Sequence, residues 1–178
     1  QALKAVARAM DRQRIIDQVP ALRRYARVLT GDAWAADDLV QDTLERACRK
    51  WVLWRSGSNL RAWLFTLMHH LYLNQLRGSP PLQVVDIDTL HEGLQAPTHD
   101  ADSALDLERC LQRLPADQRT VLLLVALEDM SYADAARVLQ IPVGTVMSRL
   151  ARARARLREL MEQSPAAPTQ KPVLRRLK

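Results

Sequence analysis

The segment Ser131–Leu157 carries hydroxyl and guanidinium groups at helical spacing, which is chemistry suited to a DNA groove. Apolar residues in its second half recur at spacings of four, three and four and predict one buried stripe: Val146, Leu150, Ala153 and Leu157. The opposite side presents Thr145, Ser148, Arg149, Arg152 and Arg156. Hydroxyls and guanidinium groups donate hydrogen bonds to phosphates and to base edges in the major groove. This pattern predicts a DNA-reading helix.

The residues before that helix predict a second, shorter helix and a tight turn. Ser131 is a favourable N-cap, and Asp134 can reach back to the free amides of the first turn. The run Gln140-Ile141-Pro142 ends this helix, because a residue before proline is pushed out of helical geometry. The alternative is an amphipathic hairpin with a solvated basic face. Five arginines in Arg149–Arg158 with no acid among them favour the helix-turn-helix, because a merely soluble face mixes signs.

Composition indicates small helical modules. Of 178 residues 48% are hydrophobic, but only 4% are aromatic and five are glycine. No apolar run approaches the roughly 20 residues that span a bilayer, and no secretory signal pattern is present, so we expect a cytoplasmic protein. Cys48 and Cys110 lie within helical patterns and are predicted to be buried thiols rather than a disulfide or metal pair.

Periodicity predicts an all-α fold of two small helical domains joined by a flexible acidic linker. The first domain, residues 1–82, has helices expected over Ile15–Leu29, Ala35–Trp51 and Leu60–Leu76. The linker, 83–103, holds five acids and no Lys or Arg. The second domain, 104–163, has helices expected over Leu105–Leu114, Asp117–Leu127, Tyr132–Leu139 and Val143–Met161. Residues 164–178 read as a disordered basic tail. The net charge of +6 is therefore unevenly distributed, with two basic domains on either side of an acidic linker. This distribution suggests that both domains face nucleic acid.

Three segments in this order resemble the extracytoplasmic-function (ECF, group 4) sigma factors of the bacterial sigma-70 family. They are YARVLTGDAWAADDLVQDTLERA (Tyr25–Ala47), NLRAWLFTLMHHLYLNQLR (Asn59–Arg77) and LPADQRTVLLLVALEDMSYADAARVLQIPVGTVMSRLARARARL (Leu114–Leu157). The resemblance implies a sigma-2 domain, a sigma-4 domain with the helix-turn-helix, and none of the middle domain of larger sigma factors. It also implies a promoter-specificity subunit of RNA polymerase, stress- or metal-responsive, that is a monomer when free and is held by an anti-sigma factor, often membrane-anchored.

The resemblance assigns promoter −10 recognition and melting to the loop Trp54–Asn59 and the helix after it. Melting requires a pocket for an unstacked base and cations that hold the displaced strand. The candidates are Arg55, Asn59, Arg61, Trp63, His70, Asn74 and Arg77. Trp63 reads equally well as a core residue. His70 stands where family members usually have asparagine. This difference bears on which base of the −10 element is preferred.

The resemblance assigns −35 recognition to the second helix of the helix-turn-helix. The candidates are Gly144, Thr145, Met147, Ser148, Arg149, Ala151 and Arg152. Gly144 allows close backbone approach, and Arg152 has the fork geometry that pairs with guanine. Met147 replaces the usual Lys or Arg and Ala151 is smaller than usual, so we expect an altered −35 preference.

An acidic face on the Ala35–Trp51 helix is the implied core-polymerase contact, on the clamp coiled coil of the largest subunit. It comprises Asp37, Asp38, Gln41, Asp42 and Glu45. Acidic residues opposite a basic helix steer and register such a contact. The alternative for this face is simple solvation.

The sequence predicts no enzyme, cofactor or metal site. It lacks a phosphate-cradling glycine loop, a metal-spaced cluster and a nucleophile–base pair. His69 and His70 are adjacent, and adjacent helical residues point about 100° apart, so they are not expected to share an ion. Two other functions stay open: a one-component helix-turn-helix regulator that binds operators as a dimer, and a sigma-like decoy that occupies a partner protein without touching DNA.

Overall fold

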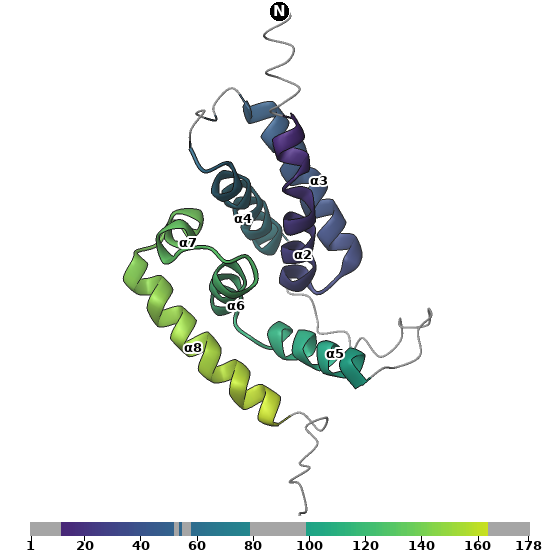
Figure 1. The fold of residues 1–178 in the computed structure, drawn as a ribbon, viewed down its shortest axis with the longest axis vertical. Helices are drawn as coiled ribbons and strands as arrows, with labels where there is room; N and C mark the ends of the chain where they lie inside the picture. Colours follow the sequence, from purple (N-terminus) through teal and green to yellow (C-terminus); the bar gives the residue numbers. More distant parts are fainter. Residues whose placement is uncertain (1–11, 52–53, 55–57, 79–98, 164–178) are drawn as a thin grey trace, which may run out of the picture.

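The computed structural model describes residues 12–51, 54, 58–78 and 99–163, and all regular structure in these residues is helical (Figure 1). The N-terminal domain contains a helical turn ending at Ile16 and then α2 (Val19–Thr30), α3 (Ala33–Lys50) and α4 (Leu60–Gly78). The C-terminal domain contains α5 (His99–Gln112), α6 (Ala116–Leu122), the π-helical turn η2 (Leu123–Leu127), α7 (Tyr132–Leu139) and α8 (Val143–Glu162). The predicted class, two all-α domains, is confirmed.

Local capping signals place most helix ends where the sequence predicts them. Gly31 ends α2 in the left-handed region with φ of 73°, and its N–H donates to the Arg27 carbonyl. The Asp32 carboxylate accepts from the Ala35 amide at 2.7 Å and begins α3. The Ser131 hydroxyl accepts from the Asp134 amide at 3.0 Å and donates to the Asp134 carboxylate, so it begins α7 as predicted.

Three expectations were wrong in detail. The helix predicted over Ile15–Leu29 is broken by a turn at residues 17–18, because Pro20 in the first turn of α2 favours a helix start there. Helix α5 begins at His99, inside the predicted linker, because its first turn lacks the apolar period that the prediction followed. Cys48 is exposed, whereas Cys110 is buried as expected.

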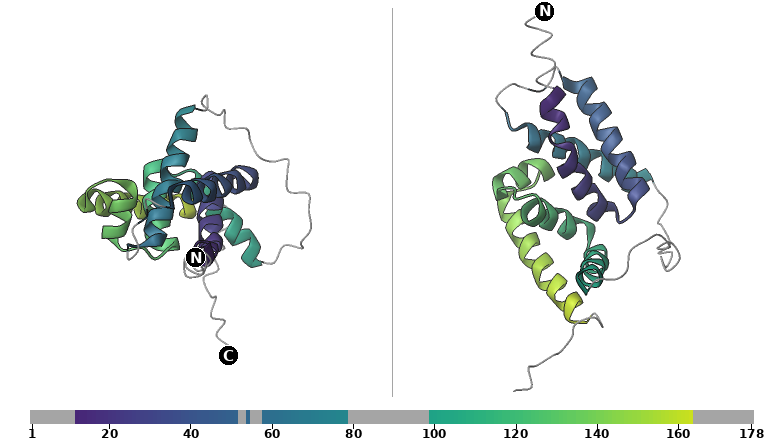
Figure 2. Two further views of the ribbon diagram at one scale, coloured as in Figure 1. Left: turned by 90° about the horizontal axis from the view of Figure 1, so that it is seen from above. Right: turned by 45° about the vertical axis from the view of Figure 1, so that its right-hand side comes forward.

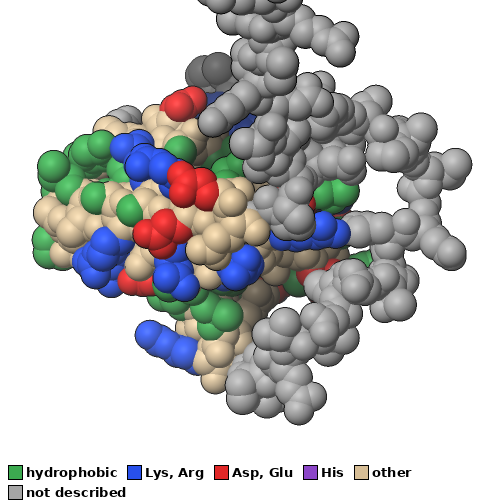
Figure 3. Space-filling model, turned by 90° about the horizontal axis from the view of Figure 1, so that it is seen from below, with side chains coloured by type: hydrophobic (Ala, Val, Ile, Leu, Met, Phe, Trp, Pro, Cys, Tyr) green, Lys and Arg blue, Asp and Glu red, His purple; other side chains and the backbone are tan. Residues whose placement is uncertain are grey.

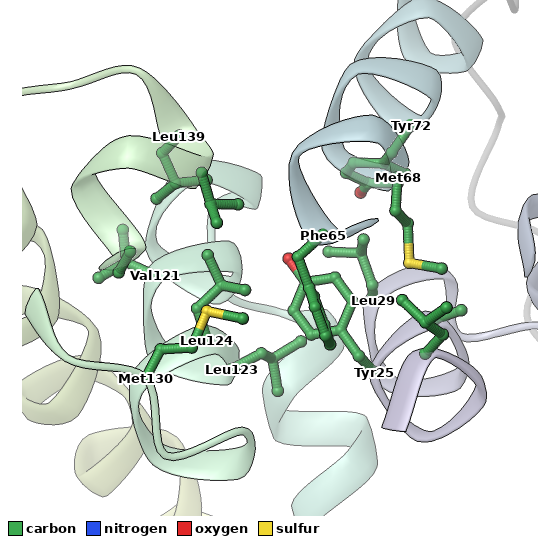
Figure 4. Packing of buried hydrophobic residues seen from close by; sticks show 14 of the residues in the cluster. Tyr25, Leu29, Phe65, Met68, Tyr72, Val121, Leu123, Leu124, Met130 and Leu139 are labelled. Atoms are coloured by element: carbon green, nitrogen blue, oxygen red, sulfur yellow. The ribbon is translucent and has the colours of Figure 1, made fainter. Parts of the chain in front are cut away.

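One hydrophobic core runs through both domains. Helix α4 packs against α3 and against α7, and α2 contacts the C-terminal domain through η2 and α5, so the two domains are in direct contact (Figures 1 and 2). At their junction the Tyr25 and Phe65 rings meet edge to face with centroids 5.1 Å apart. Figure 4 shows Leu123 and Leu124 of the C-terminal domain lying toward these rings. The N-terminal and C-terminal domains therefore form one packed body.

Candidate nucleic-acid interface

Helix α8 presents the predicted polar face to solvent because its apolar stripe is anchored in the C-terminal domain. Val146, Leu150 and Ala153 are buried, and Leu157 is half-buried against the core. Most residues of the predicted −35 face are exposed: Gly144, Met147, Ser148, Ala151 and Arg152, with Thr145 half-buried. A backbone approach at Gly144 is unobstructed, since a Cβ there would meet no atom within 4 Å.

Two of these side chains are linked along the exposed face. The Arg152 guanidinium donates to the Ser148 carbonyl at 3.3 Å and to its hydroxyl at 3.4 Å. The Ser148 hydroxyl in turn donates to the Thr145 carbonyl at 3.1 Å. These bonds hold the guanidinium beside a hydroxyl on the surface, where both groups can reach base edges or phosphates. Arg149 instead forms an ion pair with Asp117 of α6, at 3.3 Å, and lies at the side of the helix.

The predicted −10 residues fall into two groups in the structure. Near the start of α4, Asn59 caps the helix, since its carbonyl oxygen accepts from the Ala62 amide at 3.1 Å. Arg61 is held by Glu128 of the C-terminal domain, at 2.5 Å. Trp63 is half-buried and its ring lies edge to face with Trp51, with centroids 6.2 Å apart, so it packs on the core. Arg55 lies outside the described residues.

Further along α4, His70, Asn74 and Arg77 line one basic pocket of about 390 Å³. Arg46 and Lys50 of α3 join them, and Gln140, at the end of α7, completes the wall on the other side. The lining includes three cationic side chains and no acid. Such a pocket suits a nucleic-acid backbone. Sequence reasoning missed Arg46 and Lys50, although their i, i+4 spacing near the end of α3 places both on one face.

The acidic face of α3 is exposed along its length, as the sequence predicts. Asp37 lies 4.0 Å from Arg23, and Glu45 lies 3.4 Å from Arg49. Between α2 and α3 a groove of about 710 Å³ runs beside this face and includes Val40 and Leu44. Trp34 stands on the same helix at 83% exposure. An apolar groove with a rim of paired acids and arginines is a surface that a partner protein can cover.

The opposite end of the molecule differs in charge. Seen from below, arginine and lysine side chains alternate with acidic and apolar ones (Figure 3). No single sign of charge dominates this view. The pocket between α3 and α4 differs from this face, since its lining has three cationic side chains and no acid.

Metal-ligating side chains do not gather among the described residues, which hold no group of three or more His, Cys, Asp or Glu. The rings of His69 and His70 are 6.4 Å apart between centroids. Burial lowers the pKa of His69 to about 4, and the neighbouring His70 adds to this shift. No helix in the described part of the chain is long and apolar enough to span a membrane.

The fold and these surfaces define a helical protein of two domains with an exposed helix-turn-helix and a basic pocket whose cationic side chains come from α3 and α4. Comparison with known proteins gives the family. Residues 15–69 match the family model for the sigma2 domain of PhyR, and residues 104–157 match that for sigma-70 region 4. The ECF RNA polymerase sigma factor EcfG of Rhodopseudomonas palustris is 39% identical over 153 residues, covering 84% of both chains.

Solved structures agree with this assignment. The sigma factor RpoE of Bartonella quintana, in complex with the anti-sigma factor NepR, is 34% identical with a TM-score of 0.69, covering 86% of this chain and 97% of RpoE. The anti-anti-sigma factor PhyR from Bartonella quintana is 21% identical with a TM-score of 0.55, covering 80% of this chain and 48% of PhyR, and shows the fold alone. The chain belongs to the ECF sigma factors of the sigma-70 family.

Proposed function

We propose that this sigma factor divides promoter recognition between its two basic surfaces. The exposed face of α8 enters the major groove of the −35 element, and the pocket between α3 and α4 binds the −10 element. The observation that carries the proposal is that different helices supply the two surfaces: α8 of the C-terminal domain presents one, and α3 and α4 of the N-terminal domain provide the cationic side chains of the other. Core RNA polymerase then contacts the acidic face of α3.

At the −35 element, Arg152 contacts a base edge and Ser148 supports it. The bonds between these side chains favour this role, because an oriented guanidinium gives a more selective contact than a freely rotating one. The exposed Met147 offers an apolar contact to a thymine methyl group in place of a phosphate contact.

At the −10 element, His70 and Asn74 read an unpaired base while Arg46, Lys50 and Arg77 hold the strand. The convergence of these side chains on one pocket supports the assignment. The protein performs no bond chemistry in this role. Its contribution to melting is the binding free energy of the separated strand, which offsets the cost of unpairing.

An anti-sigma factor is the partner that restrains the protein. RpoE is structurally similar over most of this chain and was crystallised with the anti-sigma factor NepR. We place the protein in the cytoplasm, as a monomer when free, with an anti-sigma factor that can itself be membrane-anchored.

A decoy function is the second candidate, because the model that matches residues 15–69 describes PhyR, an anti-anti-sigma factor. A decoy occupies an anti-sigma factor and has no use for a groove-reading helix. The exposed Ser148 and Arg152 therefore favour the sigma function.

The test is reconstitution of the full chain with bacterial core RNA polymerase on a promoter library. We expect enrichment of paired −35 and −10 motifs, with initiation only when the chain is present. Specific DNA binding by the chain alone, without association with core enzyme, would indicate a one-component regulator. Capture of an anti-sigma factor without core binding or DNA binding would indicate the decoy.

A further inference from the structure

Glu128 of the C-terminal domain is a fully buried acid whose carboxylate is bound, within the described part of the chain, by arginines of the N-terminal domain. Its side chain is 0% exposed. Arg24 of α2 donates to both carboxylate oxygens, at 3.1 and 2.9 Å. Arg61 of α4 donates to the carboxylate at 2.5 Å and to the Glu128 backbone carbonyl at 3.0 Å. A buried carboxylate requires such partners, and Arg24 and Arg61 supply them only while the two domains are docked.

The contacts around Glu128 extend this docking. Phe65 lies beneath Arg61, whose guanidinium carbon is 5.5 Å from the ring centroid. Leu123 and Leu124 lie toward Tyr25 and Phe65 (Figure 4). On the other side, the Gln112 amide of α5 donates to the Val28 carbonyl near the end of α2, at 2.6 Å. The interface therefore has an apolar centre with directional polar contacts, the anatomy of a specific docking surface.

Docking occupies groups that the −10 element needs. Arg61, one of the proposed −10 contacts, is bound to Glu128. Gln140, which joins the two helices of the helix-turn-helix, forms a wall of the basic pocket. In addition, promoter elements named −35 and −10 are separated by about 25 base pairs, or about 85 Å along the helix axis. Two domains in direct contact cannot bind both elements, so they must separate before the promoter is bound.

We propose that the free chain rests in this closed conformation and that Glu128, with Arg24 and Arg61, is the latch that holds it closed. The C-terminal domain is then an intramolecular competitor for the −10 surface. The competition for the −10 surface rests on the proposed function. The closed conformation itself can be measured whether or not that function holds. Opening transfers Glu128 to water, and the apparent affinity for single-stranded −10 DNA is scaled by the fraction of molecules that are open.

The latch is tested by fluorescence energy transfer within the full chain. One dye is placed on Cys48, which is exposed on α3, and the other on an Ala155→Cys variant, exposed on α8; Cys110 is buried and stays unlabelled. The wild type should show one population of high transfer efficiency. Glu128→Arg places a third cation beside Arg24 and Arg61 and should lower the closed-to-open ratio by roughly tenfold or more.

The matched control is Glu108→Arg, the same charge change at an exposed site of α5, and it should leave the energy transfer unchanged. Circular dichroism establishes that each variant keeps its helices. If Glu128→Arg fails to fold, Arg24→Gln removes one partner from the other domain and should also open the chain, though less. Unchanged transfer in a folded latch variant, or an open population already dominant in the wild type, would overturn the latch.

Binding of single-stranded −10 DNA by the unlabelled chains then tests the consequence. Glu128→Arg should bind this DNA roughly tenfold more tightly than the charge-matched control Glu108→Arg, because the cost of opening is removed. A variant that opens but binds the DNA no more tightly than Glu108→Arg would refute intramolecular competition. If no variant binds the DNA, the proposed −10 function fails, while the energy transfer still decides whether the latch exists.

Discussion

Acid should loosen the packed molecule through His69. This side chain is buried on α4, and His70 and Tyr72 are its titratable neighbours on that helix. From the C-terminal domain, Asp117 of α6 and Arg149 of α8 line the same 280 Å³ pocket. The Asp117 carboxylate is already paired with Arg149, 3.3 Å away, and Arg149 is itself a cation, so neither group compensates a positive charge on His69. Protonation therefore places an unpaired cation in the junction between the domains.

The pKa of His69, lowered from the usual 6.5 to about 4, sets the magnitude and the sign. The folded state binds the proton less readily than the unfolded state, so the stabilisation is complete above pH 6.5 and is lost as the pH falls toward 4. Linkage with these two values gives a loss of about 1 kcal/mol at pH 6 and about 2 kcal/mol at pH 5.

The assay is urea unfolding of the full chain at pH 7.5, 6 and 5, comparing wild type with His69→Gln, which cannot titrate. Wild type should lose about 2 kcal/mol more than the variant between pH 7.5 and pH 5, because the other titrating groups cancel in the comparison. His70→Gln is the control: it leaves His69 in place and should keep most of the wild-type pH dependence. Parallel pH profiles for wild type and His69→Gln would refute the reasoning.

Three further predictions concern the two domains. Arg152→Ala should weaken binding to the −35 element by about 1–3 kcal/mol and relax its base preference, as read from a promoter library; an unchanged preference would remove Arg152 from base reading. The double variant Asp38→Arg with Asp42→Arg should weaken core-polymerase binding in a pull-down while circular dichroism is unchanged, and wild-type binding would mean that the acidic face is only solvated. Leu150→Ala should lower the free energy of unfolding by about 2–5 kcal/mol, since Leu150 is almost fully buried; a loss below 1 kcal/mol in urea unfolding would contradict its place in the core.

The helix-turn-helix could be predicted from the sequence because its signals are local. The Ser131 cap, the proline after Ile141 and the four-three-four stripe of α8 each act within a few residues, and the structure confirms all of them. The acidic face of α3 was predictable for the same reason. Where local signals competed, as at Pro20 within an apolar period, the backbone restriction of proline prevailed over the hydrophobic pattern.

The docking of the two domains could not be predicted, because it depends on pairs that are distant in sequence. Arg24 and Glu128 are 104 positions apart, and Arg61 and Glu128 are 67 apart. One sequence contains no signal that pairs them. From the sequence alone, Glu128 cannot be distinguished from any other acid at the end of a predicted helix. Arg61 likewise cannot be distinguished from an arginine that is free to contact DNA. The basic pocket was missed in part for the same reason, since its walls come from α3, α4 and the end of α7.

The backbone at residues 123–130 is irregular at the point where the domains meet. The predicted helix Asp117–Leu127 passes into the π-helical turn η2, and the Glu128 amide donates to the Leu123 carbonyl at 3.1 Å. Asp129 then adopts a left-handed conformation with φ of 51°, and the Met130 amide donates to the Leu124 carbonyl. A π turn and a left-handed aspartate are each less favourable than continued α-helix, and such irregularities concentrate at functional positions. A regular helix would rotate Glu128 away from the direction that η2 gives it. The irregular backbone therefore supports a specific role for Glu128 in docking.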